Sequence, residues 1–216
     1  MGNKNSNVLK QSNVQEKYKV IFLDVDGVLN NANSSIENLY IVEPELILIL
    51  KKIIVSSSIT NTCIVLSSTW RYTAETRDII EKSLKDQGLG NHIKSCTPYY
   101  SGTNRVYEIV SWLENNTNYD VLNKYSLELP VLKHNENSGG FLESLTRMPD
   151  NKKLNIDSIV ILDDMDLIDE IKGLGQSQTE NFAKFLNDHF VHVTKRLGLT
   201  ENDAKLASAI LNKNKA

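Results

Sequence analysis

Two aspartates, Asp24 and Asp26, directly follow a short apolar run, Val20 to Leu23. A run of this length is typical of a buried strand, since it is too short for a helix. Residues i and i+2 of an extended chain point the same way, so both carboxylates are expected on one face at the end of that strand. Gly27 then allows a sharp turn of the backbone. Because carboxylates so close together repel unless a cation neutralises them, and because oxygen ligands favour Mg²⁺, the segment predicts a magnesium site.

Two later apolar runs also end in groups that bind phosphate or metal. The first of them precedes Ser67 and Ser68, and the second precedes the acidic pair Asp163 and Asp164. Ligands bind at the carboxyl ends of the strands in open α/β sheets, so these groups are expected to meet at one sheet edge.

The order of these groups resembles the haloacid dehalogenase (HAD) superfamily of phosphatases and phosphotransferases. Its motifs would be Asp-x-Asp-Gly-Val-Leu at 24–29, Ser67, a basic residue, and the pair at 163–164. A finer pattern resembles the HAD domain of Swiss Army Knife RNA repair proteins and covers most of residues 18–212. It comprises Leu-Ser-Ser-x-Trp-Arg at 66–71, Thr-Pro at 97–98, Arg-x-x-Glu-Ile-x-x-Trp-Leu at 105–113, Leu-Asp-Asp at 162–164 and Gly-Leu-Thr at 198–200.

The resemblance implies a role for each acidic group. Asp24 would be the nucleophile that forms an aspartyl-phosphate, and Asp26 would be the general acid and base. Mg²⁺ would be held by Asp24, the backbone carbonyl of Asp26, Asp163 and Asp164. Asp166, close by in the sequence, is expected to cap a helix.

The resemblance also implies groups that hold the phosphate. Ser67 and Arg105 would stabilise its oxygens, with Ser68 and Arg71 as further substrate contacts. Alternatively, Arg71 could form an ion pair on the surface, with Trp70 packed beside the end of the sheet. The candidates that compete with Arg105 as the basic group are Lys133, Lys152 and Lys153. Glu108 is expected to be the structural partner of a basic neighbour.

Composition narrows the class of protein. A chain of 216 residues fits one α/β domain, and a net charge of −3 with a pI near 5.8 makes nucleic acid an unlikely partner. Two cysteines form no disulfide framework, and no apolar run reaches the length of a membrane helix. We therefore expect a cytoplasmic monomer. The resemblance implies that it acts on a phosphoprotein or a small phosphoester.

The first 17 residues are polar and rich in asparagine, as in a flexible arm. Gly2 and Ser6 fit the N-myristoylation pattern, although a chance match is the alternative. A single myristoyl chain would give only weak, peripheral membrane association.

Strands and helices are expected to alternate along residues 18–216, which predicts an α/β fold: a three-layer α/β/α sandwich with a parallel, doubly wound sheet and a minimal cap. Strands are expected near 19–24, 62–66, 93–96, 158–162 and 190–193. Helices are expected near 44–57, where apolar residues on all sides suggest full burial, and near 73–87, 104–113, 179–187 and after 200.

Residues 115–157 form an insertion, expected as a hairpin or a helix pair that is either a surface element or a rim that selects the substrate. The whole pattern predicts a Mg²⁺-dependent phosphohydrolase with a site open to bulky substrates. The alternatives are a non-catalytic domain that binds a phosphorylated partner, a membrane-tethered adaptor, and a nucleic-acid-end phosphatase.

Overall fold

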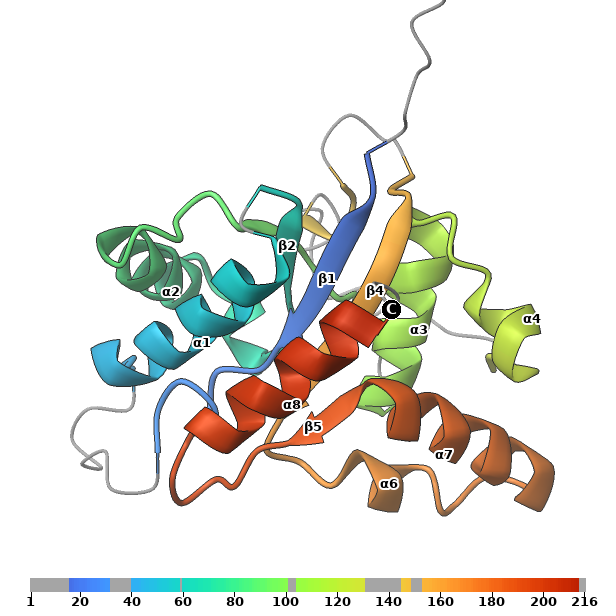
Figure 1. The fold of residues 1–216 in the computed structure, drawn as a ribbon. Helices are drawn as coiled ribbons and strands as arrows, with labels where there is room; N and C mark the ends of the chain where they lie inside the picture. Colours follow the sequence, from blue (N-terminus) through green and yellow to red (C-terminus); the bar gives the residue numbers. More distant parts are fainter. Residues whose placement is uncertain are drawn as a thin grey trace, which may run out of the picture.

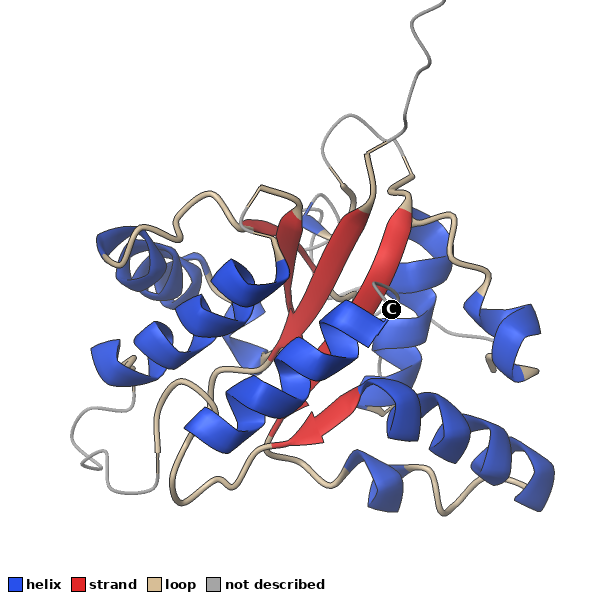
Figure 2. Cartoon of the chain, in the orientation of Figure 1, coloured by secondary structure: helices blue, strands red, loops and turns tan. Residues whose placement is uncertain are grey.

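The computed structural model describes residues 16–31, 40–58, 60–100, 104–130, 145–148 and 153–213. Their centre is one parallel sheet of five strands in the order β3-β2-β1-β4-β5. The strands are β1 (Tyr18–Leu23), β2 (Thr62–Leu66), β3 (Ile93–Cys96), β4 (Ile156–Asp163) and β5 (Phe190–His192). Helices cover both faces of this sheet (Figures 1 and 2), so the predicted α/β/α sandwich is confirmed.

The connections divide the helices between the two faces. One layer holds α1 (Pro44–Ser57), α2 (Ala74–Asp86) and α8 (Glu201–Asn212). The other holds α3 (Arg105–Asn116), α4 (Val121–Tyr125), α6 (Leu167–Glu170) and α7 (Gln176–His189). The chain winds outward from β1 to β3 and then returns to β4 on the other side of β1. The strand order therefore reverses between β1 and β4, and the crevice outside their carboxyl ends is where such sheets bind ligands.

Side-chain oxygens begin several helices at the predicted residues. Asn104 accepts from the backbone N–H of Tyr107 at the start of α3, and Thr200 forms a capping box with Asp203 at the start of α8. Asp166 caps α6, as expected, by accepting from the backbone N–H groups of the next turn. Most boundaries lie within three residues of those expected, since caps and apolar runs are local signals.

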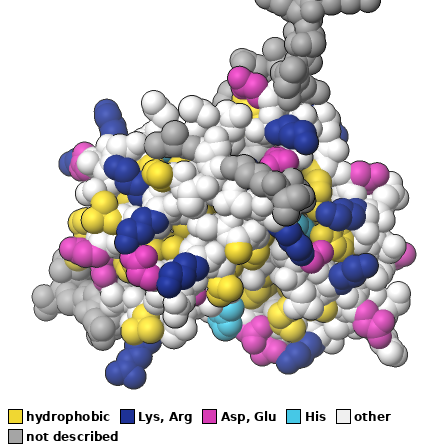
Figure 3. Space-filling model, viewed as in Figure 1, with side chains coloured by type: hydrophobic (Ala, Val, Ile, Leu, Met, Phe, Trp, Pro, Cys, Tyr) yellow, Lys and Arg dark blue, Asp and Glu magenta, His cyan; other side chains and the backbone are white. Residues whose placement is uncertain are grey.

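The surface carries both signs of charge. Figure 3 shows Lys and Arg interspersed with Asp and Glu over the face in view, without an extended basic patch. No helix in the described parts of the chain is long and apolar enough to cross a membrane. The myristoylation motif at Gly2 lies outside the described residues, as do Lys133 and Lys152.

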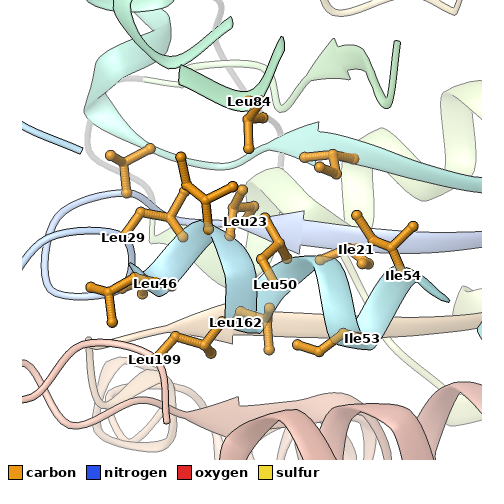
Figure 4. Packing of buried hydrophobic residues seen from close by; sticks show 14 of the residues in the cluster. Ile21, Leu23, Leu29, Leu46, Leu50, Ile53, Ile54, Leu84, Leu162 and Leu199 are labelled. Carbon is orange, nitrogen blue, oxygen red and sulfur yellow. The ribbon is translucent and has the colours of Figure 1, made fainter. Parts of the chain in front are cut away.

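The core consists of two apolar layers, because side chains on a strand alternate between its faces. Ile21 and Leu23 of β1 face α1, where Figure 4 shows them against Leu50 and Ile54. The intervening Val20 and Phe22 pack on the α3 side.

The expectation that the helix at 44–57 would be buried on all sides is wrong. Leu48 and Val55 are 45 and 58% exposed. α1 is an outer-layer helix that contacts the sheet on one side and solvent on the other, so part of its apolar surface remains uncovered.

The described part of the insertion contributes to the core. Val121, Tyr125, Leu127 and Met148 are buried in the layer that contains α3 and α7. The two ends of the insertion are joined by a parallel bridge between Thr117 and Leu154, next to the start of β4. The described segments hold one short helix, α4, and its packing shows that this end of the insertion is an integral part of the fold.

Candidate active site

Three carboxylates meet where the strand order reverses. Asp24 follows β1, Asp163 ends β4 and Asp164 comes next, and one oxygen from each lies within 4.8 Å of the others. Asp24 and Asp163 are almost fully buried. Burial raises the pKa of the Asp24 carboxyl, partly opposed by the charge of Arg105, and burial together with the charge of Asp24 raises the pKa of Asp163. Three crowded oxygen ligands with unfavourable ionisation are a donor set that fits Mg²⁺.

Arg105 supplies a positive charge next to this cluster. Its Nη1 atom lies 3.2 Å from Asp163 Oδ2 and 3.6 Å from Asp24 Oδ1. Glu170 of α6 accepts from the backbone N–H of Arg105 and so fixes the start of α3. Among its competitors, Lys153 donates instead to the carbonyl of Glu114 at the end of α3. The structure therefore brings Arg105, rather than Lys153, to the carboxylates.

Asp26 points to a different neighbour. Its Oδ1 atom accepts hydrogen bonds of 2.9 Å from Trp70 Nε1 and 3.0 Å from Asn30 Nδ2, while Asn30 Oδ1 accepts from the backbone N–H of Gly27. The Asp26 side chain is thus oriented by Trp70 of the short helix η2 (Thr69–Arg71) and by its own turn, and it is not one of the three carboxylates that lie within 4.8 Å of one another. Sequence reasoning gave no role to Asn30 and left Trp70 ambiguous, because neither contact can be read from spacing alone.

The serines after β2 are both buried but differ in their partners. The hydroxyl of Ser68 hydrogen-bonds to the Asp24 carboxylate and also accepts from the backbone N–H of Trp70. Ser67 Oγ has no hydrogen-bond partner among the described residues, and neither does Thr97 Oγ1, which follows the neighbouring β3. Buried polar atoms are rarely left unpaired. An oxygen of a bound phosphate would satisfy the Ser67 hydroxyl.

Arg71 lies in an environment that does not suit substrate contact. Its side chain is 1% exposed and donates to Glu108 Oε2 at 2.8 Å and to the carbonyls of Ser68 and Pro98. The geometry favours the ion-pair alternative, although the pair is buried between η2 and α3 rather than placed on the surface. Glu108 is the structural partner of a basic neighbour, as expected.

The turn after Asp26 leaves space for Asp164. Gly27 has φ +72°, and a Cβ atom built there would lie 2.3 Å from Asp164 Oδ2. On its other side, Asp164 faces β5 and the segment that follows it. His192 Nε2 lies 3.0 Å from the carbonyl of Asp164, and Lys195 Nζ lies 3.8 Å from Asp164 Oδ2.

Comparison with known proteins gives one family. Residues 20–125 match the family model described as the HAD domain in Swiss Army Knife RNA repair proteins. No curated protein and no solved structure matches the chain. The matched segment contains Asp24, Asp26, Ser67 and Arg105 but ends before Asp163, which reaches the same cluster through the fold.

Three observations indicate the same fold: the matching family model, the five-stranded parallel sheet between helices, and the acidic cluster at the switch point of that sheet. The chain therefore has a HAD-like α/β/α fold and resembles, over residues 20–125, the HAD domain in Swiss Army Knife RNA repair proteins, within a superfamily of phosphohydrolases.

Proposed function

We propose that this protein is a Mg²⁺-dependent phosphomonoesterase with Asp24 as its nucleophile. The observation that carries the proposal is the convergence of Asp24, Asp163 and Arg105 at the switch point of the sheet. A buried carboxylate paired with an arginine could be structural. A second and a third carboxylate at the same point repel the first, and a bound cation would neutralise them.

The first half of the reaction would transfer the phosphoryl group to the protein. An oxygen of Asp24 attacks phosphorus as the bond from phosphorus to the leaving oxygen breaks, and Asp26 gives its proton to that oxygen. Trp70 and Asn30 orient the Asp26 carboxyl for this transfer. In the second half, Asp26 takes a proton from a water molecule that attacks the aspartyl-phosphate. Inorganic phosphate leaves and Asp24 is restored.

The remaining groups would stabilise the charge that develops on the phosphate. Ser67 can donate its unpaired hydroxyl, and Arg105 can share its guanidinium between Asp24 and an equatorial oxygen. Mg²⁺ held by Asp24, the Asp26 carbonyl, Asp163 and Asp164 would reduce the repulsion between the carboxylates and the anionic substrate.

The substrate class that we propose is a bulky phosphomonoester, with a phosphoprotein as the first candidate because the net charge of −3 disfavours nucleic acid. A nucleic-acid end is the second candidate, and two observations favour it. The matched family is described by RNA repair proteins. In addition, Tyr40 is 53% exposed and its ring packs edge-on against Trp70, which donates to Asp26, so a partly exposed aromatic residue lies next to the proposed acid. Bases stack on such rings without sequence preference.

Hydrolysis of p-nitrophenyl phosphate, with and without Mg²⁺, tests the proposed chemistry. Asp24→Asn should lower kcat by at least about 10³-fold, as expected for the loss of a covalent nucleophile. Asp78→Asn on the exposed side of α2 is the matched control and should retain full activity. Beryllofluoride with Mg²⁺ should form an adduct on Asp24 that mass spectrometry can locate.

Three results would contradict the proposal: full activity in EDTA, substantial turnover by Asp24→Asn, or an adduct on another residue. Absence of turnover together with tight binding of a phosphopeptide would favour the non-catalytic alternative. If the protein does turn over p-nitrophenyl phosphate, a panel of phosphopeptides and 3′- and 5′-phosphorylated oligonucleotides would separate the two substrate candidates by kcat/KM.

A further inference from the structure

A short turn after β5 is joined to both loops that carry the carboxylates. The backbone N–H groups of Leu197 and Gly198 both donate to the carbonyl of Thr194, at 2.8 and 3.1 Å. Just before the turn, Val193 donates to the carbonyl of Asp163, and just after it Leu199 donates to the carbonyl of residue 28, each at 2.9 Å. The base of the turn is therefore fixed relative to the candidate active site.

This turn presents two consecutive cations, Lys195 and Arg196. The Lys195 ammonium lies 3.8 Å from Asp164 Oδ2, yet its side chain is 73% exposed, whereas that of Asp164 is 8% exposed. Arg196 is exposed and forms no ion pair with any residue in the described segments. Ion pairs this exposed contribute little to stability, so the fold itself does not account for these two charges.

The position of Arg105 suggests what Lys195 and Arg196 could bind. Arg105 is buried and paired with Asp24 and Asp163, so it can bind only an anion that reaches these buried carboxylates. A second anionic group on the same substrate would lie farther out. Among the described residues, two cations contact the carboxylate cluster: Arg105, and Lys195 through Asp164.

We infer that Lys195, assisted by Arg196, is a substrate-specificity residue that binds a second anionic group a few bonds from the reacting phosphate. The inference rests on the proposed function for the position of the reacting phosphate. With a divalent cation on the carboxylates, Asp164 would no longer attract Lys195, whose flexible stem would leave the ammonium free to turn to the substrate. The substrate would thus be a phosphomonoester with an additional anion, rather than an isolated phosphate.

Two non-hydrolysable ligands that differ only in the second anion test this inference. Propylphosphonate and propane-1,3-diphosphonate are titrated into the wild-type protein in saturating Mg²⁺, and their dissociation constants are measured by calorimetry. The wild type should bind the diphosphonate about 10-fold more tightly, as expected of one or two charge-assisted hydrogen bonds at an exposed site. High salt should reduce this preference.

Lys195→Ala/Arg196→Ala should bind both ligands with similar affinity. The matched control Lys184→Ala/Lys205→Ala removes two exposed charges from α7 and α8 and should keep the wild-type preference. If Lys195 only screens Asp164, its removal would change the affinity for both ligands and for Mg²⁺ equally, which would overturn the inference. Equal binding of the two ligands by the wild type would do the same.

Failure of the inference and failure of the proposed function remain distinguishable, since the titrations need no turnover. A protein that hydrolyses p-nitrophenyl phosphate but shows no diphosphonate preference would retain the proposed function and exclude the second anion site. A protein without turnover that prefers the diphosphonate through Lys195 would retain the second anion site and exclude the proposed function.

Discussion

Gly27 and Asp164 are in such close contact that no side chain larger than hydrogen fits between them. A Cβ atom on Gly27 would lie 2.3 Å from Asp164 Oδ2 and 2.5 Å from its Cγ. The turn that orients Asp26 and the loop that contributes Asp164 to the candidate metal site are thereby packed directly against each other. The glycine is required both for its φ of +72° and for the space that it leaves.

Gly27→Ala should therefore lower kcat/KM by about 100-fold, since the added methyl group displaces Asp164 and the backbone is strained by roughly 1–3 kcal/mol. The control is Gly88→Ala. Gly88 has φ +77° but only Lys51 Nζ near its Cβ position, at 3.7 Å, so that variant carries the backbone strain without the clash. Equal activity of the two variants would show that the contact with Asp164 is unimportant.

The three-carboxylate cluster should bind Mg²⁺ measurably in the absence of substrate. Mg²⁺ should raise the melting temperature of the wild type, because a ligand that binds only the folded state stabilises it. The shift should be lost in Asp163→Asn, reduced in Asp164→Asn and unchanged in the control Asp78→Asn. Ca²⁺ should also raise the melting temperature but inhibit turnover, since its larger and looser coordination shell misplaces the nucleophile. A full Mg²⁺ shift in Asp163→Asn would contradict the site.

The buried pair Arg71–Glu108 should matter for stability rather than for substrate affinity. Arg71→Ala leaves Glu108 buried without its ion-pair partner, so the free energy of unfolding should fall by about 3–5 kcal/mol in urea titrations. Arg71→Met/Glu108→Leu should recover much of this loss. Arg77→Ala, which breaks the more exposed pair with Glu81, is the control and should cost less than about 1 kcal/mol. A large rise in KM for Arg71→Ala without loss of stability would instead restore its predicted role in substrate binding.

Acid sensitivity should arise partly from His189 at the end of α7. Burial, with a smaller effect of the Lys124 charge, lowers the pKa of His189 from 6.5 to about 4. The unfolded chain takes up a proton below pH 6.5 while the folded protein resists it until about pH 4. Stability should therefore decrease by up to about 3 kcal/mol as the pH falls through this range.

Unfolding free energies of the wild type and His189→Gln, measured from pH 4 to 8, test this expectation. The His189→Gln variant should lose the part of the pH dependence between pH 6.5 and 4. The matched control is His92→Gln, which replaces a histidine whose ring lies at the edge of β2. Parallel curves for the wild type and His189→Gln would contradict the assignment.

Local patterns in the sequence determined much of the fold and the identity of the central groups. Short apolar runs followed by Asp24, Ser67 and Asp163 predicted strands with polar groups at their carboxyl ends. Asn104 and Thr200 predicted helix starts because capping uses atoms only two or three residues away. These signals can be recognised in a short segment of sequence, because each depends on interactions within a few residues.

Tertiary structure alone decided which of the charged groups face one another. Arg71 and Arg105 both lie near a strand end, and nothing in their spacing shows that the first pairs with Glu108 while the second reaches Asp24 and Asp163. Likewise, the contact of Gly27 with Asp164 and the position of Lys195 beside it depend on β1 and β5 lying on either side of β4. Such contacts depend on strand order and helix packing, which arise because apolar surface is buried over the whole chain. The spacing of two residues in the sequence therefore does not predict that they will be in contact.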